Sequence, residues 1–156
     1  MKAAFTILCL SGLLGACTTP YQNSGFTGGF EETTLGDNLF QVTFKGNGYT
    51  SAGRVRDFAL LRSAEVALEH GCRYFILVDD DDQTTTGTIS MPTTTYATSY
   101  GNSTTFNTYG GTSSYSKASS TNIIACFAEK PEGVAFDARQ VVASLRKKYR
   151  LKGDDL

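Results

Sequence analysis

Residues 55–71 constrain the fold of this chain more than any other stretch, because they form the pattern of one helix with two apolar sides. At 3.6 residues per turn, one side collects Leu60, Leu61, Ala64, Ala67 and Leu68, and a second stripe collects Val55, Ala59 and Val66. A polar edge collects Arg54, Arg62, Glu65 and Glu69. A helix that is apolar on two sides must be covered on two sides. We therefore expect this helix to lie inside a small domain.

Strand-like runs flank this helix and predict the fold class. Residues 38–45 alternate, and the apolar face of that run is formed by Phe40, Val42 and Phe44. Residues 74–78 are apolar on both faces, as in an inner strand, and residues 123–128 resume the strand pattern. A second amphipathic helix begins at Asp137. The order strand, helix, strand, long loop, strand, helix predicts an α+β fold with a small three-stranded sheet and two helices on one face.

Between the last two strands, residues 83–122 are dominated by Ser and Thr, with scattered tyrosines. A segment of this length without a periodic apolar face cannot offset the entropy that ordering removes. We expect a mobile low-complexity insertion within a single domain of residues 36–152. In an alternative interpretation, the two ends of the insertion extend the flanking strands as a ragged hairpin.

Residues 1–16 have the composition of a signal peptide. Lys2 supplies the positive start, residues 3–14 form an apolar run, and residues 14–16 form a small-residue cleavage site. The run is shorter than the ~20 apolar residues that a transmembrane helix needs. We expect removal of residues 1–16. The Gly-, Thr-, Ser- and Asn-rich segment 17–35 then has the composition of a flexible tether.

The tetrad Leu14-Gly15-Ala16-Cys17 resembles the bacterial lipobox. The resemblance implies transfer of a diacylglyceryl group to the Cys17 sulfur, cleavage before Cys17 and acylation of the new amine. Two or three acyl chains hold a protein firmly on a membrane, which a single chain does not. Thr18 follows Cys17 in place of an Asp. By resemblance to enterobacterial sorting, this favours the outer membrane with the domain facing the periplasm, and leaves the cell surface open. The alternative is an ordinary secreted protein with a free Cys17.

A longer block of sequence carries three recognisable pieces. They are Leu35, Asn38 and Phe40; Phe44-Lys45-Gly46-Asn47; and Asp57-Phe58-Ala59-Leu60-Leu61-Arg62-Ser63-Ala64-Glu65. This block resembles a family of proteobacterial lipoproteins with no assigned function, whose members also tend to carry a Ser/Thr-rich insert before the last strand. The resemblance implies an envelope lipoprotein, and it brings no catalytic residues with it.

The net charge and the number of cysteines indicate which partners the chain can bind and in which cellular compartment it lies. The formal net charge is −1, which becomes −2 without Lys2, and no clustered basic excess indicates nucleic-acid binding. Once Cys17 is acylated and residues 1–16 are removed, Cys72 and Cys126 remain as an even pair in an oxidising compartment. Cys72 opens one predicted strand and Cys126 lies late in the next, so antiparallel pairing would bring them together as a disulfide. The alternative is two buried thiols that never meet.

Three patterns resemble functional motifs but fit a structural interpretation better. Residues 46–53 are glycine-rich, yet they lack the third glycine of a dinucleotide loop and the Lys-Ser/Thr of a P-loop, so we predict a turn and a helix cap. The side chains of Asp79 to Asp82 alternate along an extended chain and rarely converge on one calcium ion. His70 is the only histidine and lacks an HExxH partner. We therefore predict no catalytic, cofactor-binding or metal-binding residues.

The function predicted from these patterns is that of a non-catalytic outer-membrane lipoprotein. It would act in structure, assembly or sensing through contacts with a protein partner in the envelope. We predict no nucleic acid, small-molecule substrate or cofactor. An envelope hydrolase and a glycan-binding module are the alternatives. Tyrosines of residues 83–122 would serve a glycan binder by stacking, and the basic residues of 146–152 would contact anionic lipid or a sugar polymer. The simpler interpretation is a disordered segment with sparse aromatic residues for the former and a solvated face for the latter.

Overall fold

The structure, a computed structural model, describes residues 17–152. Its elements in chain order are β1 (Gly29–Gly36), β2 (Leu39–Lys45), α1 (Ala52–Glu69), β3 (Tyr74–Tyr100), β4 (Ser103–Phe127), β5 (Phe136–Asp137) and α2 (Ala138–Tyr149). Within these residues, the strands form one five-stranded antiparallel sheet in the order β1-β2-β4-β3-β5. The predicted α+β class is confirmed. The predicted number of three strands is wrong, because the sequence pattern does not reveal β1 and β5.

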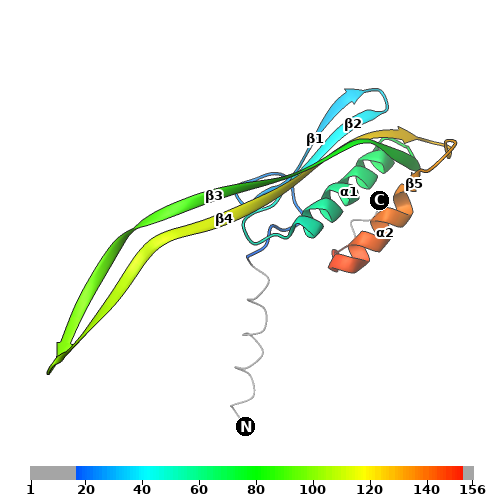
Figure 1. The fold of residues 1–156 in the computed structure, drawn as a ribbon. Helices are drawn as coiled ribbons and strands as arrows, with labels where there is room; N and C mark the ends of the chain where they lie inside the picture. The colour runs from blue at the N-terminus through cyan, green and yellow to red at the C-terminus, as the bar shows by residue number, and fades with distance from the viewer. Residues whose placement is uncertain (1–16, 153–156) are drawn as a thin grey trace, which may run out of the picture. The chain divides into compact units, whose positions relative to one another are not determined.

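The sheet contains a split β-α-β unit. β1 and β2 form an antiparallel hairpin, and β4 pairs antiparallel with β2 along residues 119–125. A two-residue turn joins β3 to β4, so these two strands are also antiparallel. β2 and β3 consequently run parallel on either side of β4, and α1 connects them (Figure 1). Both helices lie on the same side of the sheet in Figure 1.

The core lies between the sheet and α1. Phe40, Val42 and Phe44 of β2 share one face, as predicted, and each is at most 2% exposed. β3 and β4 contribute Phe75, Ile124 and Cys126 to the same core. α1 buries residues from both predicted apolar stripes, together with Phe58: Val55, Ala59, Leu61, Ala64, Val66 and Ala67. α2 packs against another side of α1, with Val141 and Val142 at the edge of the core. The predicted coverage of this helix on two sides is confirmed.

The ends of α1 show the predicted cap chemistry. Ser51 is the N-cap, and its Oγ accepts a backbone N–H of the first turn at 3.4 Å. His70 is the C-cap, and Gly71 follows with a φ of +75°, a left-handed conformation that suits glycine. Because the cap lies at Ser51, α1 begins at Ala52, ahead of the predicted start at residue 55.

β1 occupies residues that the sequence assigns to a tether. Residues 17–35 are predicted to be flexible, but β1 begins at Gly29 and pairs with β2 along its length. Tyr21 and Phe30 also pack together, with ring centroids 5.0 Å apart. β1 is an edge strand, and its side chains beyond Phe30 are exposed. Its sequence therefore lacks the alternation of apolar and polar residues by which a strand is predicted. The signal peptide predicted for residues 1–16 lies outside the described residues.

The predicted long loop is a β-hairpin. β3 and β4 continue through residues 83–122 and meet at the turn Gly101-Asn102. Residues 85–116 form a compact unit of their own, which we call the hairpin unit. Within it, threonine and serine hydroxyls pair across the strands, at 2.9 Å for Thr95–Thr108 and 3.0 Å for Ser99–Thr104. The prediction of a loop overlooks the β-branched side chain of threonine, which favours extended backbone. The alternative of strands that extend into the insertion is closer to the structure.

Replacing residues 85–116 with a short Asn-Gly turn should change the stability of the remaining domain little. These residues form their own unit, and shortening the connection to two residues changes the loop-closure free energy by only about 2.5 kcal/mol, in the stabilising direction. Phe40→Ala is the matched contrast, because losing a buried phenylalanine ring costs about 3–5 kcal/mol. Urea unfolding of both variants measures the difference. A loss in the shortened chain as large as that of Phe40→Ala would place the hairpin unit in the cooperative core.

The structure joins Cys72 and Cys126 in a disulfide, with Sγ atoms 2.13 Å and Cα atoms 5.6 Å apart. Cys72 lies just before β3, and Cys126 lies near the end of β4. Both cysteines are in the core, at 5% and 0% exposure. The bond therefore closes a covalent loop that contains the whole hairpin unit.

Reducing this disulfide should destabilise the domain by about 4 kcal/mol. The two cysteines are 54 residues apart in sequence, and the chain-entropy model assigns a stabilisation of that size to such a loop. Alkylation of the denatured but unreduced protein should leave Cys72 and Cys126 unmodified. Two reactive thiols without reductant, or a melting temperature that reductant does not change, would contradict the bond.

Candidate functional site

The first described residues are held against the loop between β2 and α1. Thr19 is 1% exposed, and its backbone N–H donates to the Thr50 hydroxyl at 2.8 Å. The Thr19 hydroxyl donates to the carbonyl of Thr27 at 2.8 Å and accepts the backbone N–H of Asn47 at 2.8 Å. We call this arrangement the Thr19 seat. Because these hydrogen bonds are buried or partly buried, detaching residues 17–19 would leave polar groups of the domain unpaired.

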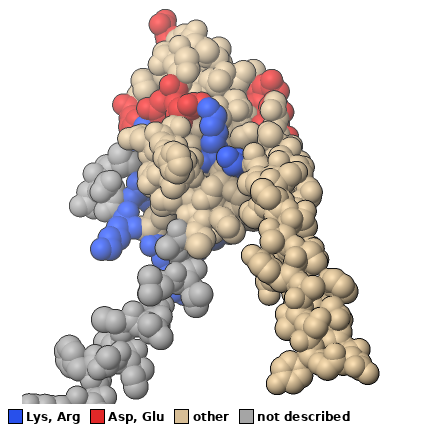
Figure 2. Space-filling model, turned by 90° about the vertical axis from the view of Figure 1, so that its left-hand side faces the viewer, with Lys and Arg blue, Asp and Glu red and all other residues tan. Residues whose placement is uncertain are grey.

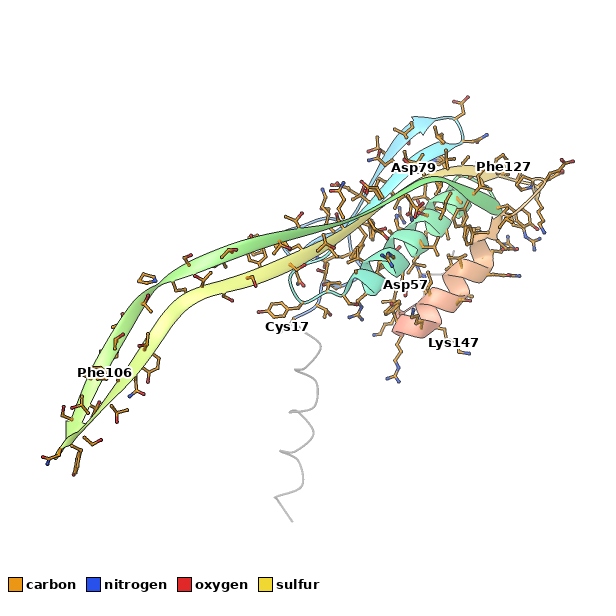
Figure 3. The ribbon with its side chains drawn as sticks, in the orientation of Figure 1. Cys17, Asp57, Asp79, Phe106, Phe127 and Lys147 are labelled. Atoms are coloured by element: carbon orange, nitrogen blue, oxygen red, sulfur yellow. A yellow bond between two sulfur atoms is a disulfide. The ribbon has the colours of Figure 1, made fainter. Side chains whose placement is uncertain are left out.

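Two longer side chains extend the Thr19 seat to Cys17. The Asn47 amide donates to the Cys17 carbonyl at 2.9 Å. Arg54 donates to the Thr18 hydroxyl at 3.0 Å, and its guanidinium lies 5.1 Å from the ring centroid of Tyr149 in α2. The Cys17 thiol itself is free and exposed at the N-terminal end of α1 (Figure 3). Cys17 is therefore fixed beside the domain, where the sequence predicts a flexible tether.

The turn chemistry of residues 46–48 explains how the loop forms this seat. A Cβ atom at Gly46 would lie 2.8 Å from a methyl of Val55 and 3.2 Å from the Ala118 carbonyl, so the close approach requires glycine. The Asn47 side chain accepts the backbone N–H of Tyr49 at 3.0 Å, as in an Asx turn. The predicted turn is confirmed. Its polar side chains hold the N-terminal segment, a role that local sequence does not reveal.

A cavity of about 470 Å³ lies between the N-terminal segment, α1 and the end of α2. Its most buried charge is Glu65, whose side chain is 4% exposed. Arg146 of α2 donates to Glu65 Oε1 from Nη2 at 2.8 Å and from Nε at 3.1 Å. Tyr21 donates to Glu65 Oε2, and Arg62 donates to the same oxygen at 3.4 Å. The Glu65 carboxylate therefore connects three separate parts of the chain.

Arg62 and Glu69 of α1, which also line this cavity, are paired with opposite charges. Arg62 also donates to Glu32 of β1 and to Glu69, which lies about two turns further along α1, at 2.7 Å in each case. Burial lowers the pKa of Arg62, but hydrogen bonds to Glu32 and Glu69 outweigh it, so the pKa is raised. Burial and the negative charge of Glu65 raise the pKa of Tyr21, which keeps this phenol a donor throughout the neutral range. Both Glu65 oxygens accept hydrogen bonds, so this carboxylate is poorly placed to abstract a proton.

The other residues singled out in the sequence lie apart from this cavity. Asp82 pairs with Arg56, and Asp81 accepts a hydrogen bond from Gln83 at 2.6 Å. No three His, Cys, Asp or Glu side chains among residues 17–152 are grouped so as to hold a metal ion. The His70 Nδ1 lies 2.9 Å from the Val66 carbonyl, and the ring packs 4.3 Å from the Phe40 ring centroid.

Sequence reasoning missed the role of Glu65. The helical pattern places it on the polar edge of α1 with Arg62 and Glu69, which suggests a solvated face. Its partners Tyr21 and Arg146 are 44 and 81 residues away in sequence, so no local pattern connects them.

Comparison with known proteins leaves the family open. The chain matches no protein-family model, no curated protein and no solved structure. Across residues 17–152, neither helix has both the length and the apolar character that crossing a membrane requires.

Glu65→Gln should destabilise the domain by about 3 kcal/mol. The substitution leaves the guanidinium groups of Arg62 and Arg146, which are 13% and 17% exposed, without their shared buried counter-charge. Glu31→Gln is the matched control, because the ion pair of Glu31 with Lys45 is half exposed and is worth about 0–1 kcal/mol. Urea denaturation measures both. Equal effects of the two substitutions would contradict the assigned role of Glu65.

Proposed function

We propose that this chain is a lipoprotein of the bacterial envelope, acylated at Cys17 and anchored in the outer membrane with its domain facing the periplasm. The observation that carries the proposal is the position of Cys17. Its thiol is exposed, and its carbonyl is held at 2.9 Å by Asn47, so the sulfur is open to modification at a fixed point of the domain. The lipobox-like tetrad that ends at Cys17 supports the same assignment.

We assign the domain a non-catalytic role in structure, assembly or sensing through protein contacts. The state of Glu65 supports this assignment, because both carboxylate oxygens accept hydrogen bonds from Tyr21, Arg62 or Arg146. A general acid or base needs a group that is free to exchange a proton with a substrate. Glu65 serves instead to hold the N-terminal segment and α2 on α1.

The hairpin unit is the surface through which we expect a protein partner to bind. No Asp, Glu, Lys, Arg or His occurs from Gln83 to Ser116. Apolar side chains are nevertheless exposed on it, including Met91 at 56% and Phe106 at 69%. An uncharged surface that exposes apolar side chains suits protein contact, since interface cores are depleted of charge and enriched in aromatic residues and Met.

A glycan-binding module is the second candidate, favoured by the tyrosines of the hairpin unit. The rings of Tyr96 and Tyr109 lie 6.1 Å apart, and Tyr100 is 91% exposed. A photoreactive cross-linking residue placed at position 106, in place of Phe106, distinguishes the two candidates in living cells. A protein partner gives a cross-linked protein, whereas a glycan binder is retained on purified peptidoglycan without one.

Cys17→Ala should abolish fatty-acid labelling of the chain in growing cells. The sulfur is the acceptor of the diacylglyceryl group, so without it the precursor should stay uncleaved or the chain should leave the membrane fraction. A Cys72→Ala, Cys126→Ala double variant is the control and should keep its label. Labelling that persists in Cys17→Ala would remove the basis of the proposed anchor.

A further inference from the structure

Three features of the domain meet around Cys17 and point to one partner. They are the Thr19 seat, two exposed aromatic side chains beside it, and the basic end of α2. The inference that follows rests on the proposed lipid anchor, and it adds a second, non-covalent contact between the domain and the bilayer.

The aromatic side chains belong to the two loops that hold Thr19. Phe26 lies in a turn next to Thr27, whose carbonyl accepts the Thr19 hydroxyl, and the Phe26 ring is fully exposed. Tyr49 is 75% exposed and follows Asn47, which binds the Cys17 carbonyl. Phenylalanine and tyrosine rings gain free energy when they leave water, and tyrosine is enriched at membrane interfaces. Both rings lie on loops that contact the segment carrying the lipid.

The basic end of α2 lies beside the same segment. The Arg54 guanidinium binds Thr18 and stacks on Tyr149, so the last turn of α2 is one side chain away from residues 17–19. This end of the chain exposes Lys147, Lys148, Arg150 and Lys152. Lys148 donates to Asp57 at 2.5 Å, and the other three form no side-chain ion pair with any of residues 17–152.

Acidic and basic side chains are unevenly distributed over the domain. In the face shown in Figure 2, the acidic side chains lie over the upper part with some basic side chains beside them, and further basic side chains project at the lower left. In Figure 3 Cys17 and Lys147 both lie on the lower side, on which the helices pack. A basic surface next to an acyl anchor is attracted to anionic headgroups within about 10 Å, the screening length at moderate salt.

We propose that Phe26, Tyr49 and the basic end of α2 form a face that binds the phospholipid bilayer. The two rings enter the interfacial layer, and Lys147, Arg150 and Lys152 lie against headgroup phosphates. The acyl chains on Cys17 and this face together hold the domain in one orientation, with the β4–β5 loop pointing away from the membrane.

Tryptophan fluorescence tests this face, because the chain contains no Trp and each introduced indole is a unique probe. The lipidated variants Phe26→Trp and Tyr49→Trp are reconstituted into vesicles of phosphatidylethanolamine and phosphatidylglycerol with brominated acyl chains. Each should lose about twofold or more of its fluorescence relative to unbrominated vesicles, because the indole sits at the interface. Val134→Trp is the control. Val134 is 92% exposed and follows β4, whose last residue Phe127 lies at the opposite end of the domain from Cys17 (Figure 3).

Charge neutralisation tests the basic part of the face without the lipid. In a Cys17→Ala chain produced without the apolar residues 1–16, Lys147→Gln with Arg150→Gln should weaken partitioning onto phosphatidylglycerol vesicles roughly 25-fold, since each basic residue near an anionic surface contributes about fivefold. Lys130→Gln with Arg139→Gln is the matched control, because both residues are exposed, Lys130 lies in the loop between β4 and β5, and Arg139 lies in the first turn of α2. These substitutions should leave partitioning unchanged.

The outcomes separate this inference from the proposed anchor. If the lipidated chain enters vesicles but Phe26→Trp and Tyr49→Trp stay as bright as Val134→Trp, the face does not contact lipid and the inference is wrong, while the anchor stands. Equal partitioning of the two charge variants removes the basic part of the face. If the chain purified from membranes carries no acyl group, the anchor and the inference both fail.

Discussion

The structure depends on covering α1 from more than one side. A sheet face of phenylalanine, valine and isoleucine side chains covers one side of the helix, and α2 covers another. The N-terminal segment completes the enclosure, because the Tyr21 ring lies 5.3 Å from that of Phe58. Burial of α1 is what forces the polar edge of the helix against other elements. Glu65 then needs Tyr21 and Arg146 as partners, since a buried carboxylate without them would be costly.

The sequence predicts those features of the fold that depend on a regular spacing of neighbouring residues. A helix within residues 55–71 and the inward face of β2 follow from spacing alone, and the structure has both. β1 and β5 could not be predicted in this way, because one is an exposed edge strand and the other has two residues. The strands of the hairpin unit were not predicted for a different reason. Its strands have no buried face, so they lack the alternation by which strands are recognised.

In the candidate site, too, local motifs could be predicted and contacts between distant residues could not. The turn at Gly46-Asn47-Gly48 is readable from its residues, and Cys17 stands out through the motif around it. That Asn47 and Thr50 hold residues 17–19 is not readable, because these hydrogen bonds span about 30 residues of sequence. These contacts change how freely the N-terminal segment can move. A flexible tether would let the domain sample many orientations relative to Cys17, whereas the Thr19 seat fixes Cys17 relative to the two loops that contact it.

The disulfide between Cys72 and Cys126 has a mechanical consequence. All of β3 and most of β4 lie inside the covalent loop that it closes. A force applied to the hairpin unit can peel these strands from the sheet, but it cannot extend the chain past the two sulfur atoms. The load then passes directly from Cys126 to Cys72, which lies just after α1. Under tension, the domain would release a limited length of chain and keep its two helices connected.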